Sequence, residues 1–155
     1  MTATQKGKMI KILATGFGAG LSPVAPGTAG TLVGVLVCLI SYPLPWILRL
    51  AFVLAIAAAS IYVSHQAEAI YGKKDDQRIV IDEIAGLQVA MLPVAVTGLH
   101  LLFAFVLFRM FDIWKPFPVN RLQNLKGGWG VVADDLGAGA YAGFILLLLT
   151  KTGVL

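Results

Sequence analysis

The stretch VVADDLGAGAYAGFILLLLT, residues 131–150, places two adjacent acidic residues, Asp134 and Asp135, before an uncharged apolar run. An earlier stretch repeats this arrangement, because Asp82 and Glu83 stand directly before another long apolar run. A carboxylate at the centre of a bilayer costs roughly 2.5–3.5 kcal/mol on insertion scales, so acids beside apolar helices are usually partnered or functional. The two acid pairs therefore indicate a membrane protein with polar chemistry at the ends of its helices.

The composition of the whole chain supports a membrane protein. Hydrophobic residues make up 58% of the 155 residues and charged residues 13%, and the mean hydropathy is +0.84. In soluble domains, roughly a quarter of the residues are charged. The length fits one domain, so we expect a single all-α integral-membrane domain over residues 1–155. One cysteine, Cys38, excludes an intramolecular disulfide and a cysteine metal cluster.

The N-terminal segment is rich in lysine and leads into glycines and prolines. A cleavable signal would instead lead into a compact apolar core with a small-residue cleavage site, so we expect this segment to be retained. The net charge is +4. Because the basic residues flank apolar segments, we attribute this charge to attraction toward anionic lipid headgroups and not to nucleic-acid binding.

Charges and prolines divide the chain into five candidate helices, at about 29–42, 45–66, 83–97, 98–114 and 133–151. Several are shorter than the roughly 20 apolar residues that cross a bilayer comfortably. The break between the third and fourth is the least defined, because 84–108 is also readable as one kinked helix. With five spans, ten of the twelve basic residues share one side with the N-terminus, and the positive-inside rule makes that side cytoplasmic. All eight acidic residues fall at the same side.

The stretch GFGAGLSPVAPGTAGT, residues 16–31, prevents a regular helix until about Thr28. The free N–H groups of the helix that follows, with the hydroxyls of Ser22 and Thr28, suit an anion such as phosphate. A helix cap with close packing through Gly30 and Gly34 explains the same residues. The sequence leaves both interpretations open.

The acid pairs also have two interpretations. A helix dipole favours a carboxylate in the first turn by roughly 0.3–1 kcal/mol, which explains one acid per helix more easily than two. A hard divalent cation such as Mg²⁺ takes oxygen ligands and commonly bridges carboxylates to a substrate phosphate. We therefore predict a metal site formed by Asp82, Glu83, Asp134 and Asp135.

A third polar stretch, FRMFDIWKPFP at 108–118, carries Arg109, Asp112 and Lys115 at three-residue spacing. This spacing allows a structural ladder of ion pairs along one helix. The two cations are equally suited to clamp a phosphate. His65 is interpretable as a structural interfacial histidine or as a general acid.

Taken together, these stretches resemble the bacterial phosphatidylglycerophosphatase A family. The resemblance rests on 16–31, His65-Gln66, DDQRIVIDEIAG at 75–86, 108–118 and GGWGVVADDLGAG at 127–139. It implies a Mg²⁺-dependent lipid phosphomonoesterase of the bacterial inner membrane, which converts phosphatidylglycerophosphate to phosphatidylglycerol and phosphate on the cytoplasmic side. The positions carried over from the family are Ser22, Thr28, His65, Asp75, Asp82, Glu83, Arg109, Asp112, Lys115, Asp134 and Asp135.

Within this framework we assign roles to the polar residues. We expect Asp82 and Asp134 with their neighbours to bind Mg²⁺ and the cations Arg109 and Lys115 to stabilise the phosphate, with Ser22 and Thr28 as further phosphate ligands and His65 as a catalytic residue. Attack by water and a covalent aspartyl-phosphate both remain open. The alternatives are a phosphatase for another lipid or polyprenyl phosphate, or a small cation transporter, which would lack an acidic residue on the far side.

Overall fold

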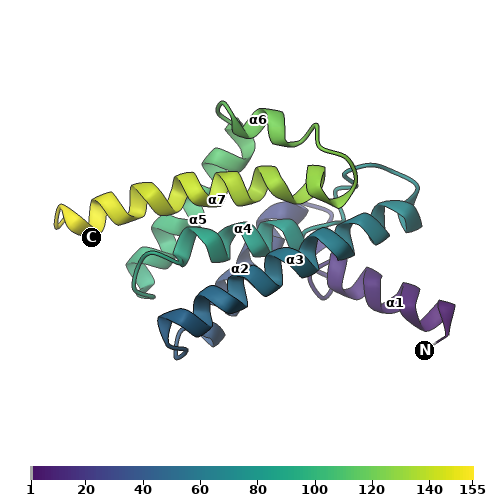
Figure 1. Ribbon diagram of the computed structural model, residues 1–155, viewed down its shortest axis with the longest axis horizontal. Helices are drawn as coiled ribbons and strands as arrows, with labels where there is room; N and C mark the ends of the chain where they lie inside the picture. The colour runs from purple at the N-terminus through teal and green to yellow at the C-terminus, as the bar shows by residue number, and fades with distance from the viewer. Residues whose placement is uncertain (1) are drawn as a thin grey trace.

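The computed structural model describes residues 2–155 and is helical throughout, with no strand in that range (Figure 1). The all-α fold class is therefore confirmed. The elements are α1 (Ala3–Ala14), the 3₁₀ turn η1 (Ala19–Leu21), α2 (Pro26–Ser41), α3 (Trp46–Tyr71), α4 (Ile81–Met91), α5 (Gly98–Trp114), α6 (Val119–Leu122) and α7 (Gly128–Lys151).

Each of the five predicted apolar segments is a helix, although their ends differ from the prediction. The break between the third and fourth is confirmed, because α4 ends at Met91 and α5 begins at Gly98. The side chain of Thr97 caps α5 by accepting a hydrogen bond from the His100 N–H at 3.2 Å. α7 begins at Gly128, five residues before the predicted start, which places the acid pair of this segment inside the helix.

Two further helices, α1 and α6, were not predicted. α1 begins with a reciprocal capping box, in which Thr2 and Gln5 each bind the other's backbone N–H. Its buried residues Ile10 and Ala14 pack against Val63 of α3 and its neighbours. α1 is therefore held by one apolar face although the rest of it is lysine-rich.

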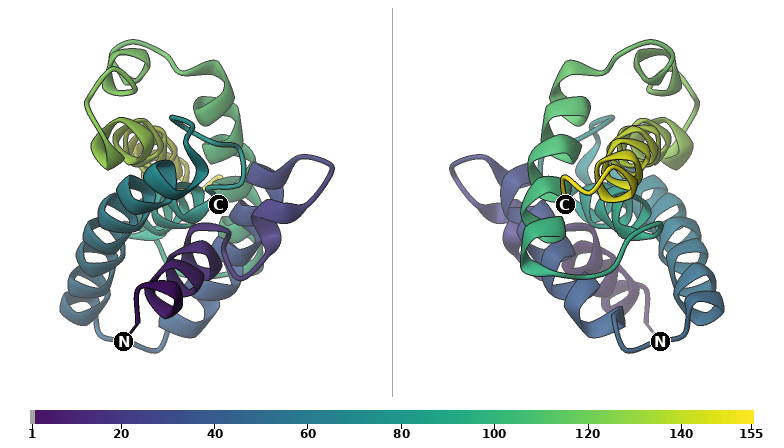
Figure 2. Two further views of the ribbon diagram at one scale, coloured as in Figure 1. Left: turned by 90° about the vertical axis from the view of Figure 1, so that its right-hand side faces the viewer. Right: turned by 90° about the vertical axis from the view of Figure 1, so that its left-hand side faces the viewer.

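The short helix α4 lies at the centre of the fold and contacts α2, α3, α5 and α7 (Figures 1 and 2). Its side chains Leu87 and Met91 are buried with Phe108 of α5 and Leu146 of α7. The contact between α4 and α7 depends on glycine, because a Cβ on Gly139 would collide with a backbone carbonyl of α4. Close packing through small residues is typical of helices in membranes.

The far end of α4 is closed by an arginine from α3. Arg49 Nη2 donates to the carbonyl oxygens of Met91 at 2.9 Å, Leu92 at 3.3 Å and Val94 at 3.3 Å. The last carbonyls of a helix have no partner within the helix. Arg49 therefore acts as a C-terminal cap for α4.

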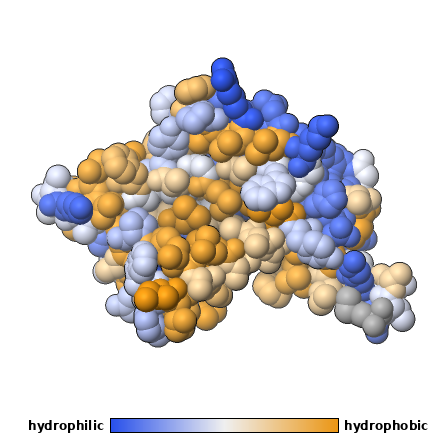
Figure 3. Space-filling view, viewed as in Figure 1, coloured by the Kyte–Doolittle hydropathy of each residue, from blue (hydrophilic) through white to orange (hydrophobic). Residues whose placement is uncertain are grey.

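α3 and α7 are long and apolar enough to cross a membrane. Hydrophobic side chains dominate the middle of the face seen in Figure 3, and hydrophilic ones gather toward its edges. Large apolar side chains such as Ile40, Ile47 and Phe144 are more than half exposed, which is typical of a surface that meets lipid. The chain is thus membrane-associated by composition and fold, and the number and orientation of its spans stay predictions.

Candidate active site

A polar cavity of about 340 Å³ opens where the N-terminus of α2, the 72–80 segment, the start of α4, the end of α5 and the first half of α7 meet. Most of the predicted site residues line it. Those residues are Asp75, Asp82, Glu83, Arg109, Asp112, Lys115, Asp134 and Asp135.

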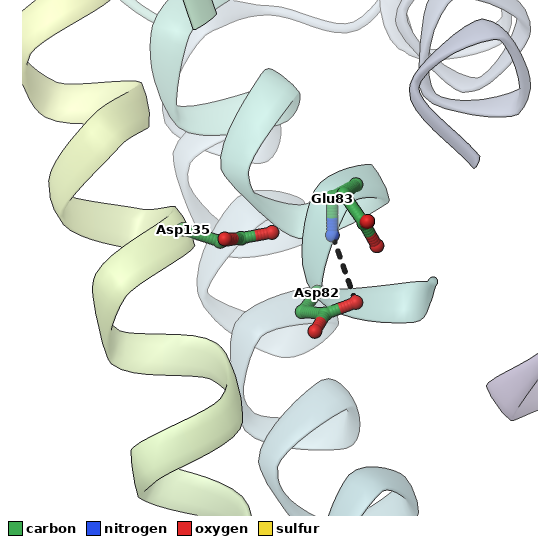
Figure 4. Close-up of side chains that lie close together, drawn as sticks. All are labelled: Asp82, Glu83 and Asp135. Atoms are coloured by element: carbon green, nitrogen blue, oxygen red, sulfur yellow. Dashed lines mark hydrogen bonds between the residues drawn. The ribbon is translucent and has the colours of Figure 1, made fainter. Parts of the chain in front are cut away.

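Three carboxylates form a cluster at the floor of this cavity. Asp82 and Glu83 stand in the first turn of α4, and Asp135 reaches toward them from α7 (Figure 4). One carboxylate oxygen from each lies within 4.8 Å of the other two. Asp82 Oδ1 also accepts the Glu83 N–H at 3.1 Å. Asp82 is 5% exposed and Asp135 4%, so these two carboxylates are largely shielded from bulk water.

The carboxylate oxygens of the cavity are incompletely satisfied. Among the described residues, Glu83 Oε2, Asp134 Oδ1 and Asp135 Oδ2 are buried and have no hydrogen-bond partner. Buried carboxylates are costly unless they are paired, hydrogen-bonded or bound to a metal. Asp82, Glu83 and Asp135 offer only oxygen ligands, the set that a hard divalent cation such as Mg²⁺ prefers. These three residues therefore fit a metal ion.

The helix dipole does not explain the acid pair of α7. The first turn of α7 contains no acidic residue, and Asp134 and Asp135 lie beyond it. The dipole effect decays within that first turn. Successive residues of a helix point about 100° apart, and the two acids accordingly have different partners. Asp135 joins the carboxylate cluster, whereas Asp134 Oδ2 accepts a hydrogen bond from Lys115.

Both cations of the cavity are held by carboxylates. Arg109 Nη1 donates to Asp112 Oδ2 at 2.6 Å and lies 3.9 Å from Glu83 Oε1. Burial lowers the pKa of Lys115, but the hydrogen bond and charge of Asp134, with nearby Asp135 and Asp112, outweigh it and raise that pKa above its usual 10.5. Lys115 is therefore a cation at neutral pH.

The N-terminus of α2 borders the same cavity. Ala25 has a left-handed backbone (φ 48°), Pro26 opens the helix, and no side chain caps it. A Cβ on Gly27 would lie 3.0 Å from Arg109 Nη1 and closer still to Glu83 Oε1. Glycine thus allows the helix start, with its free N–H groups, to approach the charged residues.

Three predicted site residues lie outside the cavity lining. Ser22 donates to the Val24 carbonyl at 2.8 Å and closes a turn before α2. Thr28 is in the first turn of α2 but does not line the cavity. His65 lines a separate cavity between α3 and the start of α7, beside Gly127. The structure therefore does not bring these three to the acid cluster, and their roles stay predictions.

The segment before α4 has an ion pair that we did not predict from the sequence. Arg78 donates to the Asp76 carboxylate through Nε at 2.7 Å and Nη2 at 3.0 Å. These hydrogen bonds hold the pKa of Asp76 below its usual value. The pair fixes a segment whose residues Asp75 and Gln77 line the cavity. The spacing of Asp76 and Arg78 in the sequence could have indicated this pair, because an aspartate side chain commonly accepts a hydrogen bond from the backbone N–H two residues later.

Comparison with known proteins gives a consistent result. The profile of the family described as phosphatidylglycerophosphatase A matches residues 12–150. A Bacteroides thetaiotaomicron protein, provisionally named a phosphatidylinositol-3-phosphatase, is 38% identical over 148 residues, which cover 90% of this chain and 92% of that protein.

Two relatives are named phosphatidylglycerophosphatase A. The one from Escherichia coli is 35% identical over 140 residues, covering 89% of this chain and 81% of the relative. The one from Haemophilus influenzae is 34% identical over 143 residues, covering 90% and 88%. No solved structure matches the chain. The matches extend over nearly the whole chain, including every segment that lines the cavity, and the chain therefore belongs to the phosphatidylglycerophosphatase A family of phosphatases.

Proposed function

We propose that the chain is a Mg²⁺-dependent phosphatase that hydrolyses phosphatidylglycerophosphate to phosphatidylglycerol and inorganic phosphate at the cytoplasmic face of a bacterial inner membrane. The observation that carries the proposal is the position of the Asp82–Glu83–Asp135 cluster in one open cavity with two cations. The substrate follows from the names of the two phosphatidylglycerophosphatase A relatives.

In this proposal Asp82, Glu83 and Asp135 hold the metal. Mg²⁺, when bound, would neutralise charge on the substrate phosphate and make water a better nucleophile. Glu83 Oε2 and Asp135 Oδ2 support the assignment, because no hydrogen-bond donor of the protein occupies these oxygens.

Arg109 and Lys115 would hold the oxygens of the phosphoryl group. Arg109 Nε is buried without a hydrogen-bond partner, so the hydrogen-bonding capacity of this guanidinium is not used up within the protein. The free N–H groups at the start of α2 lie on the same side of the cavity. Charge on the transferring phosphoryl group spreads over three oxygens, and fixed donors around it stabilise the transition state.

Asp134 is the one acid of the two pairs that the metal cluster does not use. Lys115 fixes one of its oxygens, and the other, Oδ1, has no partner. We assign Asp134 Oδ1 as the atom that accepts the proton of the attacking water. The Lys115 cation beside it keeps this carboxylate in position and faces the incoming phosphate.

The lipid tails would stay in the bilayer while the headgroup enters the cavity. α2 and α5 both border the cavity and carry exposed apolar side chains, among them Leu36 and Ile113. The cytoplasmic orientation is supported by the excess of basic residues on the side of the N-terminus.

The test is phosphate release by the detergent-solubilised chain from phosphatidylglycerophosphate, with Mg²⁺ or with a chelator. We expect release only with the metal. Phosphatidylinositol 3-phosphate is assayed in parallel, because the Bacteroides relative is provisionally named for that substrate, and a polyprenyl phosphate is the third substrate. Faster hydrolysis of either alternative would reject the proposed headgroup, and equal release with the chelator would reject the metal.

A further inference from the structure

A second cavity, of about 440 Å³ and distinct from the one beside His65, shares a wall with the polar cavity of the candidate active site, the acid cavity. The common wall is the 75–79 segment, where Asp75, Gln77 and Ile79 line the acid cavity and Arg78 lines the second one. The rest of the second cavity comes from the end of α1, the residues around η1 and the end of α3. Its principal residues are Lys11, Ile12, Phe17, Leu21, Tyr71 and Arg78.

Two cations of this cavity stand over one aromatic ring. The Arg78 guanidinium lies 3.9 Å from the centroid of Tyr71, and Lys11 Nζ lies 5.9 Å from it. Asp76 receives two side-chain hydrogen bonds from Arg78. Since a guanidinium has five N–H groups, three remain for a ligand. Arg78 is therefore a fixed, partly unused donor that suits a phosphate.

Exposed apolar side chains complete the second cavity. Ile12 is 52% exposed, Phe17 75% and Leu21 64%. A ligand with a charged phosphate and apolar chains satisfies both the cations and this wall. A soluble anion would leave the apolar wall in water.

The second cavity also lies at the end of a candidate membrane span. Tyr71 is the last residue of α3, a helix long enough to cross a membrane. α1 lies obliquely against this end of α3 (Figure 1) and adds the exposed lysines Lys6 and Lys8. Basic residues at the cytoplasmic edge of a span attract anionic lipids.

We propose that this second cavity binds an anionic phospholipid, and that it does so without hydrolysis. The phosphate would lie between Lys11 Nζ and the free side of the Arg78 guanidinium, with the acyl chains over Phe17 and Leu21. None of the described residues that line this cavity is a carboxylate, so it lacks the metal ligands found on the other side of the 75–79 segment.

The test measures lipid binding to the full chain in neutral detergent by native mass spectrometry. The probes are phosphatidylglycerol and phosphatidylcholine with the same acyl chains. We expect one site that prefers phosphatidylglycerol, and about fivefold weaker binding in Lys11→Gln, the effect of one basic residue near an anionic lipid. Lys11 is exposed, so the variant should fold.

Lys8→Gln is the matched control, because Lys8 is exposed on the same helix but does not line the cavity. An equal loss in Lys8→Gln would show diffuse attraction and overturn the site. Equal binding of the two lipids, or displacement by inorganic phosphate at low concentration, would overturn the ligand. Asp135→Asn should bind phosphatidylglycerol like the parent, so the result is independent of phosphatase activity.

Discussion

The backbone oxygen of Asp135 lies 2.7 Å from the point that a Cβ on Gly86 would occupy. Asp135 of the carboxylate cluster and the centre of α4 are therefore in close backbone contact, one turn along α4 from Asp82. The same added methyl would also meet the ring of Phe108. The separation of the two helices, and with it the geometry of the carboxylate cluster, depends on the absence of a side chain at position 86.

Gly86→Ala should separate α4 from α7 and lower the free energy of unfolding by about 1–3 kcal/mol, the usual cost of overpacking a core. Gly7→Ala is the matched control, since it is also a helix position but has no atom within 4 Å of its added Cβ. We expect that control to be neutral or slightly stabilising, because alanine is the better helix former. Equal stability of both variants in denaturant titrations would contradict the contact.

Asp82→Asn and Asp135→Asn should each abolish phosphate release and remove the rise in thermal stability that Mg²⁺ produces. These changes keep the shape of the side chain but remove the charge that a hard cation needs. Helix-end charges alone would instead cost under about 1 kcal/mol and leave turnover intact.

Asp76→Asn is the control for this metal prediction. Asp76 is a buried carboxylate that binds Arg78 and does not line the acid cavity. This variant should therefore keep its response to Mg²⁺. Near-normal rates in both metal-ligand variants would show that the cluster does not hold the metal.

Lys115→Met should lower kcat by roughly 100-fold or more, since removing one donor to a developing oxyanion usually costs that much. The protein yield should change far less. Lys126→Met removes an exposed lysine beside His65 and outside the acid cavity, and should leave kcat unchanged. A folded Lys115→Met protein with normal turnover would exclude the phosphate clamp.

The Asp76–Arg78 pair should make stability depend on acid pH. The hydrogen bonds from Arg78 lower the pKa of Asp76 in the folded chain, whereas an unfolded aspartate titrates near 3.9. The stabilisation is then present above about pH 4 and is lost as the pH falls through the lower, folded pKa.

Arg78 is 42% exposed, so solvent screens the pair and its contribution to stability is small. Asp76→Asn should therefore unfold more easily than the parent at pH 7, and the difference should be smaller at pH 2. Unfolding curves of both proteins at the two pH values measure this difference. If the difference in stability between the two proteins is the same at both pH values, the loss comes from packing and not from the charge of Asp76.

The predicted orientation is testable by cysteine labelling in intact cells. In a Cys38→Ser background, a cysteine at Lys73 should react only from the cytoplasm and one at Gly153 only from outside. Both positions are exposed. Reaction of both from one face would remove the five-span arrangement.

Hydropathy was sufficient to predict five helices because each has a run of apolar residues bounded by charge or proline. It did not predict α1, whose three lysines mask a narrow buried face, although the Thr2–Gln5 capping box was visible in the sequence. The acids of the site were also predicted from the sequence, but the different roles of Asp134 and Asp135 were not. Whether Asp134 or Asp135 faces α4 depends on the rotation of α7, and tertiary packing determines that rotation.

His65 illustrates a second limit. We predicted it near the acids because the five-span topology assigns both to the same side of the membrane. α3 continues for six residues beyond His65 before it ends, and the side chain packs against Gly127 at the start of α7. Two residues at the same depth in a bilayer need not be in contact, because they can lie on helix faces that point in different directions.

The Arg49 cap on α4 has a consequence for the response of the enzyme to its bilayer. Eleven residues of helix rise only about 16 Å, roughly half of the hydrocarbon thickness. Arg49 satisfies the last carbonyls of α4 from within the protein, so the C-terminal end of this helix does not have to reach a lipid headgroup layer. Thicker or thinner membranes should therefore tilt α3 and α7, which absorb the mismatch, while the carboxylates at the start of α4 keep their spacing.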